Sequence, residues 1–158
     1  MKIIKYAGLG VMVLALVSIV IGVVFITEGI MKNNLIVDRM NVEQVSLNLD
    51  PNNPTVFTQI NNAEDAQRAA DLIAEHRRSI APTYQDLLAQ SGGRFDPTNL
   101  TDLTYAQAMN LENYLYMAVT AFGLIQATIA NGVFMVIVGV AVGIIGFIIY
   151  RFSRIKLI

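Results

Sequence analysis

Two long runs without charge dominate the pattern of apolar and polar positions along the chain. Between Lys5 and Glu28 there are 22 consecutive uncharged residues, and between Glu112 and Arg151 there are 38. A membrane-spanning helix needs roughly 20 apolar residues, so each run is long enough to cross a bilayer. The segment between the two runs is polar and acidic. The pattern therefore predicts a membrane helix near each end of the chain and a small domain between them.

The second run contains Asn131-Gly132, a turn-forming pair that would fit either a hairpin of two spans or one long helix. In steps of three and four, apolar positions pass through Gly132 without a break in phase. They are Leu111, Leu115, Ala118, Phe122, Ile125, Ile129, Gly132, Val136, Gly139, Gly143, Gly146 and Tyr150. An uninterrupted stripe of this length is typical of one continuous helix with one packing face. At about 1.5 Å per residue, only residues from about 132 to 150 need lie in hydrocarbon, so the other half extends outside the bilayer.

The charges predict which side of the membrane each segment occupies. The N-terminal tail carries Lys2 and Lys5, the C-terminal tail RFSRIKLI carries three bases, and neither tail carries an acid. Residues 33–112 hold 11 acids and 5 bases. The positive-inside rule then places both termini in the cytoplasm and residues 32–112 outside the cytoplasmic (inner) membrane. Because two ends on one side require an even number of spans, the charges also favour one long second helix.

The first run begins like a secretory signal, with two lysines before an apolar core. The core is longer than a signal peptide needs, and the following ITEGIMKNN offers no cleavage site of the A-x-A type. We therefore expect an uncleaved signal-anchor helix from roughly Ile4 to Met31.

Small residues recur every seven positions in both predicted spans. Helices associate in lipid mainly where small residues let their backbones approach, and a repeat of seven favours a left-handed crossing. Either the two spans pack on each other as an antiparallel hairpin, or one series faces a different protein. The predicted helix-packing residues are Gly8, Ala15, Gly22, Gly29, Gly132, Gly139, Gly143 and Gly146.

The middle segment predicts a small α+β domain. Residues 34–50 are rich in Val, Leu and Ile and suggest one or two short strands, followed by a turn at DPNNP, residues 50–54. Asn61 or Asn62 would cap a helix whose apolar face includes Ala66, Ala69, Ala70 and Ile73. Pro82 would start a second helix ended by Gly92-Gly93, and Thr101 or Asp102 would cap the long helix. We expect Tyr84, Leu87, Leu88, Phe95, Tyr105 and Met109 to rest on that helix.

The fold class expected from these patterns is a mainly α membrane protein with two transmembrane helices and a small α+β extracytoplasmic domain. Its parts are a signal-anchor helix over 1–31, the extracytoplasmic domain over 32–101, and a long helix over 102–151. The C-terminal half of the long helix spans the membrane, and a basic cytoplasmic tail covers 152–158.

Residues that carry chemistry are scarce. The chain has no cysteine and one histidine, His76, on a charged helix. A metal site needs several convergent ligands, and the phosphate-binding glycine motifs are absent from the sequence. We therefore expect no catalytic, cofactor-binding or metal-binding residues and no nucleotide or nucleic-acid partner. Glu28 lies level with Gln126, Thr128 and Asn131, and is read either as an ion or proton site or as an interfacial residue paired with Lys32.

Four features carry a family resemblance. They are the NLIVD segment Asn34–Asp38, AEHRRSIAPTYQDLL over Ala74–Leu88, AQAMNLENYLYMAV over Ala106–Val119, and the glycine-rich final span. With these features the chain resembles a family of small bacterial two-span membrane proteins of unknown function, often labelled aromatic ring-opening dioxygenases. Where that family has a glycine before Thr-Tyr, this chain has Pro82. The label implies an iron site of two histidines and one carboxylate, which a single histidine does not supply.

The function expected from the sequence is that of a non-enzymatic accessory or structural subunit of a larger integral membrane complex. Its partners would be other integral membrane subunits and the lipid bilayer. The alternative is a freestanding membrane-anchored module that binds or senses a ligand through its extracytoplasmic domain.

Overall fold

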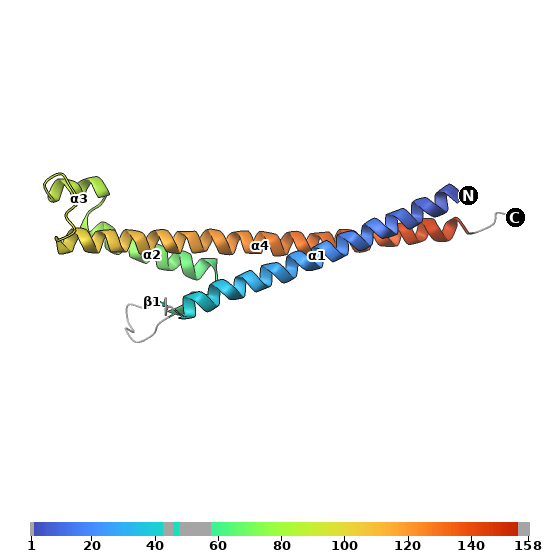
Figure 1. Ribbon diagram of the computed structural model, residues 1–158, viewed down its shortest axis with the longest axis horizontal. Coiled ribbons are helices and arrows are strands. Elements are labelled where there is room, and N and C mark those ends of the chain that lie inside the picture. The colour runs from blue at the N-terminus through green and yellow to red at the C-terminus, as the bar shows by residue number, and fades with distance from the viewer. Residues whose placement is uncertain (1, 43–45, 48–57, 155–158) are drawn as a thin grey trace. The chain divides into compact units, whose positions relative to one another are not determined.

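The structure is a computed structural model, which describes residues 2–42, 46–47 and 58–154 (Figure 1). It divides into two compact units, unit 1 with residues 1–33 and 124–158, and unit 2 with residues 34–123. The elements in chain order are α1 (Lys2–Val42), β1 (Ser46–Leu47), β2 (Thr58–Gln59), α2 (Ala63–Ile80), α3 (Tyr84–Gln90) and α4 (Leu100–Phe152).

Helix α1 is longer than the sequence pattern predicts. Expected to end near Met31, it continues to Val42 and takes in residues 34–42, for which a strand was expected. In unit 2, Ile36, Val37 and Met40 pack against a buried cluster, and their spacing puts them on one face of a helix. The prediction of a strand there is wrong because this packing outweighs the weak strand preference of two β-branched residues.

The expected α+β domain is likewise wrong, because the regular structure in the described part of unit 2 is helical apart from one minimal strand pair. Strands β1 and β2 are two residues long each and pair antiparallel, with Ser46 opposite Gln59 and Leu47 opposite Thr58. A ladder this short is no sheet on which helices could pack. The turn expected at residues 50–54 lies outside the described residues.

Helix α4 covers 53 residues and passes through Asn131 and Gly132 without a break. A hairpin at this pair is therefore excluded, and the unbroken apolar stripe through Gly132 is explained by one continuous helix. At about 1.5 Å per residue the helix is roughly 80 Å long, more than twice the roughly 30 Å of a bilayer's hydrocarbon core.

In unit 2, α2 packs on α4 through a face made almost entirely of alanine. The N-cap of α2 is Asn62, whose side-chain oxygen accepts a hydrogen bond from the Asp65 backbone N–H at 2.9 Å. This settles the expected choice between Asn61 and Asn62. Behind the cap, the small side chains allow the two helices to lie close together. The core cluster consists of Ile60, Ala66, Ala69, Ala70, Leu115, Ala118 and Phe122.

A second, smaller cluster surrounds α3. The helix begins at Tyr84 rather than at Pro82. Its N-cap is Thr83, and Asp86 closes a capping box with it. Gly92 and Gly93 follow with φ of 75° and 90°, the left-handed conformation that ends a helix. Of the residues expected to rest on α4, Leu87 and Tyr105 are fully buried and Met109 packs against them, while Leu88 and Phe95 are half-buried and Tyr84 is exposed.

Helix α4 begins slightly earlier than predicted, because Asn99 is its cap. The Asn99 side-chain oxygen accepts a hydrogen bond from the Thr101 backbone N–H at 2.9 Å, and its carbonyl accepts one from Leu103. Neither Thr101 nor Asp102 is the cap, since both already lie within the helix.

Candidate functional site

The contact between α1 and α4 in unit 1 is built on the residues that recur every seven. On α1 the buried positions among the described residues of unit 1 are Gly8, Ala15, Gly22 and Gly29. On α4 they are Ile125, Gly132, Gly139 and Gly146. These eight residues are called the glycine seam below. As the residue number rises along α1 it falls along α4, so the helices run antiparallel.

At the centre of the seam the two backbones touch. A methyl group added at Gly22 would lie 2.6 Å from the Gly132 carbonyl oxygen, and one added at Gly132 would lie 2.6 Å from the Gly22 carbonyl oxygen. Real β-carbons do not approach backbone atoms this closely, and a backbone cannot rotate away as a side chain can. Glycine is therefore required at both positions for this helix spacing.

The same close approach repeats toward the chain termini. A methyl group at Gly139 would lie 2.9 Å from the Ala15 carbonyl oxygen, and one at Gly8 would lie 2.8 Å from the Tyr150 backbone nitrogen. At Gly143 the nearest atom would be the Ala15 β-carbon at 3.4 Å, an ordinary contact. The G-x-x-x-G pair seen in the sequence is thus unequal, because Gly139 lies in the tight seam and Gly143 beside it.

One side-chain hydrogen bond crosses between the described helices of unit 1. The Ser18 hydroxyl donates to the Met135 backbone carbonyl at 2.9 Å. The helical N–H that already binds this carbonyl leaves one lone pair free, and Ser18 uses it. Sequence reasoning missed Ser18, which lies one turn from Ala15 and Gly22. A serine beside a small-residue stripe is the signal that points to it.

In unit 2 the charged side chain of Arg77 on α2 has two partners on α4. Its Nε donates to Glu112 Oε2 at 2.6 Å, and its Nη1 donates to the Tyr105 hydroxyl at 2.5 Å. The side chains of Arg77 and Glu112 are only 12% and 11% exposed. The hydrogen bond to Glu112 raises the pKa of Arg77 above its ordinary value, so this arginine stays charged. Tyr105 and Glu112 are seven residues apart and share one face of α4.

A second polar contact joins the same two helices. The Tyr116 hydroxyl, one turn beyond Glu112, donates to Asp71 Oδ1 at 2.8 Å. Sequence reasoning missed both contacts, because α2 reads as a solvated charged helix and its partners are 35 and 45 residues away. The available signal is Glu112 itself, the last acid in the sequence, seven residues after Tyr105 on the same helix face.

Asp102 is fully buried and ties the loop after α3 to the start of α4. Its carboxylate accepts hydrogen bonds from the Ser91 hydroxyl at 2.5 Å and from the Asp96 backbone N–H at 2.8 Å. In the same loop, hydrogen bonds from the Thr98 side chain and backbone lower the pKa of Asp96 below its usual range. These contacts are structural, since every atom involved already has a partner within the loop.

Among the described residues, neither His76 nor Glu28 lies in a cluster of metal-ligating side chains. His76 is exposed on α2, and the described residues contain no group of three or more metal-ligating side chains. Glu28 is exposed on α1, and none of the described residues gives it an ion-pair or hydrogen-bond partner, Lys32 included. Thr128 donates to the Leu124 carbonyl of its own helix at 2.8 Å.

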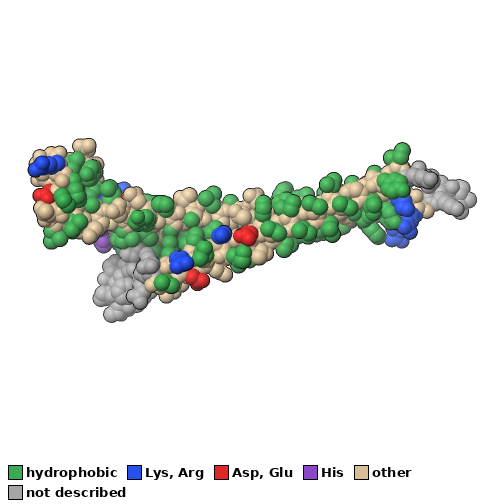
Figure 2. All heavy atoms as spheres, viewed as in Figure 1, with side chains coloured by type: hydrophobic (Ala, Val, Ile, Leu, Met, Phe, Trp, Pro, Cys, Tyr) green, Lys and Arg blue, Asp and Glu red, His purple; other side chains and the backbone are tan. Residues whose placement is uncertain are grey.

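Outside the seam, unit 1 presents apolar side chains to its surroundings. Leu14 and Phe134 are 69% and 65% exposed, and Figure 2 shows hydrophobic side chains over both helices. By length and composition, α1 and α4 can each cross a membrane. No family model, curated protein or solved structure matches the chain. The family resemblance drawn from the sequence stays a prediction.

Proposed function

We propose that the chain is a non-enzymatic accessory subunit of a larger membrane complex, inserted through α1 and the C-terminal half of α4. In this proposal both termini lie in the cytoplasm and residues 32–112 lie outside. The glycine seam closes the two spans into a hairpin whose outer surface is apolar. Lipid can cover an apolar surface of this kind, so we look for a partner on the part of α4 that belongs to unit 2.

The observation that supports a partner is a mostly apolar stripe on the part of α4 that belongs to unit 2. Tyr114 and Met117 are 68% and 66% exposed there, although water would surround them in the proposed topology. A contiguous exposed apolar patch outside the lipid typically marks an interaction surface. The stripe, called the outer stripe below, steps by four and three residues through Leu103, Gln107, Asn110, Tyr114, Met117 and Ala121.

The spacing of the outer stripe favours a helix as the partner. Positions that alternate by three and four form the seam of a coiled coil, where each side chain enters a gap on the facing helix. The apolar contacts would come from Leu103 and from the segment between Tyr114 and Ala121. The two polar members of the stripe, Gln107 and Asn110, lie between them, and polar side chains within such a seam fix its register at some cost in stability.

The described residues of unit 2 leave most of the outer stripe exposed. It lies to one side of the buried face of α4, on which Leu115 and Phe122 meet α2. Five of its six members are exposed, and Ala121 is half-buried. A partner helix could therefore dock here without displacing α2.

Native mass spectrometry of the full chain, purified in mild detergent from its own membrane, tests this proposal. We expect a stoichiometric set of co-purifying membrane subunits. The variant Tyr114→Glu, which puts a charge in the outer stripe, should lose them. Thr120→Glu is the matched control, because Thr120 is exposed on the same stretch of α4 but outside the stripe.

A lone monomer or homodimer in the unmodified protein would overturn the proposed function. A small molecule retained by such a monomer would favour the freestanding binding module instead. Equal loss of subunits in both glutamate variants would show that the outer stripe is not the contact.

A further inference from the structure

A pocket of about 180 Å³ lies on the last two turns of α4, lined by Phe147, Ile148, Arg151 and Phe152. These positions follow the spacing i, i+1, i+4 and i+5, which places them on one face of the helix. At about 3.6 residues per turn, this face lies roughly opposite the seam residue Gly146. The pocket therefore opens on the side of α4 that faces away from α1.

The chemistry of the pocket is amphipathic. Three of the four lining side chains are apolar, and Phe147 and Phe152 are 53% and 66% exposed, so they are open to a ligand. The fourth is Arg151, the first charged residue after Glu112 in the sequence. Along the helix axis, an apolar surface thus ends in a guanidinium at the point where the 38 uncharged residues end.

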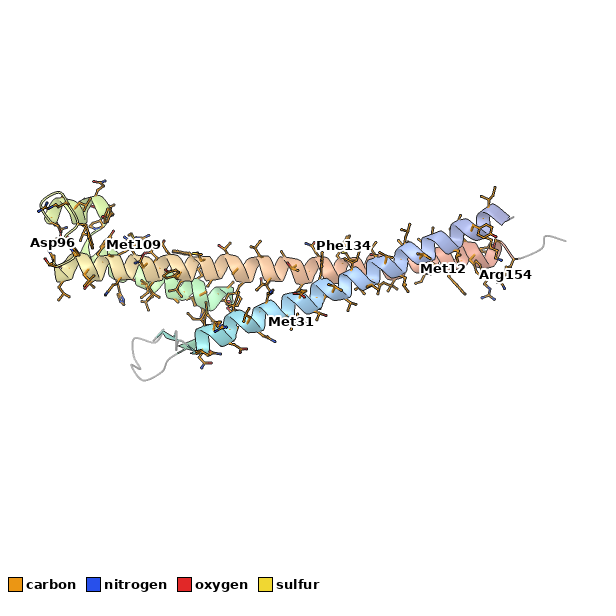
Figure 3. All side chains as sticks on the ribbon, viewed as in Figure 1. Met12, Met31, Asp96, Met109, Phe134 and Arg154 are labelled. Atoms are coloured by element: carbon orange, nitrogen blue, oxygen red, sulfur yellow. The ribbon has the colours of Figure 1, made fainter. Side chains whose placement is uncertain are left out.

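The surroundings of Arg151 make the end of unit 1 positively charged. Arg154 lies one turn later, and its guanidinium carbon is 4.9 Å from the Tyr150 ring centroid while it donates a hydrogen bond to the Tyr150 hydroxyl. Lys5 is exposed on α1, whose N-terminus lies beside the C-terminal end of α4 (Figure 3). The sequence places no acid before Glu28 or after Glu112, so this charge is uncompensated.

We propose that this pocket binds an anionic glycerophospholipid, with its phosphate at Arg151 and an acyl chain against Phe147, Ile148 and Phe152. A guanidinium binds phosphate through charge-assisted hydrogen bonds, and basic pockets at the cytoplasmic ends of spans suit anionic headgroups. Free phosphate would leave the apolar wall uncovered, and a zwitterionic lipid would leave the positive charge uncompensated. The inference rests on the membrane insertion within the proposed function, but not on the partner at the outer stripe.

Lipid retention by the full chain tests the proposal. The protein is reconstituted with equal amounts of phosphatidylglycerol and phosphatidylcholine, and stepwise delipidation is followed by native mass spectrometry. We expect preferential retention of phosphatidylglycerol, reduced about tenfold in Arg151→Gln because a charge-assisted hydrogen bond is lost. Arg151→Lys should keep part of the preference. Arg154→Gln is the matched control, since that guanidinium is held on Tyr150 and does not line the pocket.

Three results would contradict the proposal that the pocket binds an anionic lipid. One is an unchanged lipid ratio in Arg151→Gln, and another is an equal loss in Arg154→Gln, which would indicate a diffuse charge effect. The third is displacement of the lipid by inorganic phosphate, which would show that the apolar wall contributes nothing. A chain that alkaline carbonate extracts from membranes would contradict membrane insertion itself, whereas an inserted chain without lipid preference contradicts the pocket alone.

Discussion

At Gly22 and Gly132 a single methyl group decides whether two helices can meet. Elsewhere in a helix, replacing glycine by alanine is favourable by about 1 kcal/mol, because alanine loses less conformational entropy. In the glycine seam the same methyl group would meet a carbonyl oxygen at 2.6 Å. The sign of a glycine-to-alanine substitution therefore reports whether that glycine lies in the seam.

We predict that Gly22→Ala lowers the free energy of unfolding by about 1–3 kcal/mol, the usual cost of overpacking. Gly10→Ala on the same helix should be neutral or stabilising, because nothing lies within 4 Å of the added methyl group. Unfolding of the full chain in mild detergent, followed by circular dichroism against added denaturing detergent, measures both. Equal stability of the two variants would contradict the seam.

The ion pair of Arg77 and Glu112 offers a second comparison at single residues. These side chains are 12% and 11% exposed, whereas those of the pair Arg68 and Glu64 are 62% and 72% exposed. Removing one member of a buried pair leaves the other charged without a partner, while an exposed charge regains water.

We predict that Glu112→Gln destabilises the packing of α2 on α4 by about 3 kcal/mol. Glu64→Gln should change it by less than about 1 kcal/mol. Hydrogen exchange of the α2 backbone amides, read by mass spectrometry on the full chain, gives the local free energy of opening. Similar exchange rates in the two variants would show that Glu112 is not needed to hold α2.

Among the elements, the loop between α3 and α4 depends on Asp102. Without this carboxylate, the Ser91 hydroxyl and the Asp96 backbone N–H would lose their acceptor in a partly buried contact. The loop also contains the exposed Arg94, where trypsin can cut once the backbone is released.

We predict that Asp102→Ala accelerates tryptic cleavage after Arg94 by about tenfold or more, because two hydrogen bonds to a charged group are lost. Thr104→Ala, which removes only an exposed hydroxyl bound to its own helix, should cleave at the rate of the unmodified chain. Mass spectrometry of the fragments identifies the bond cut. Unchanged cleavage in Asp102→Ala would contradict the role given to this carboxylate.

The elements differ in how far sequence alone predicts them. The stripe through Gly132 is a local periodicity, so the long helix α4 can be predicted. The predicted packing set differs from the seam at two positions, because it includes Gly143, which lies beside the seam, and omits Ile125. The extension of α1 to Val42 depends on Ile36 and Met40 meeting residues far along the chain. The bond between Arg77 and Glu112 also joins distant positions, and a charged helix face gives no sign of which arginine is buried.

For the molecule as a whole, the charge asymmetry predicts one orientation in the membrane. Because the chain has no cysteine, a single introduced cysteine reports its own location. We predict that Ser79→Cys in α2 reacts with a membrane-impermeant maleimide added to spheroplasts, whose cytoplasmic membrane is intact. A cysteine appended after Ile158 should react only after the membrane is permeabilised. Labelling of both cysteines in spheroplasts that have not been permeabilised would contradict the placement of the termini.

Because small residues repeat every seven positions in the glycine seam, α1 and α4 can pair in more than one alignment with similar packing. A slide of seven residues, about 10 Å along the axis, would again set small residue against small residue at several positions. The native alignment is therefore chosen by the features that do not repeat. They are the larger members of the seam, Ala15 on α1 and Ile125 on α4, because every other seam position is glycine. A chain with glycine at both of these positions would keep two tightly apposed helices but lose the side chains that favour one alignment.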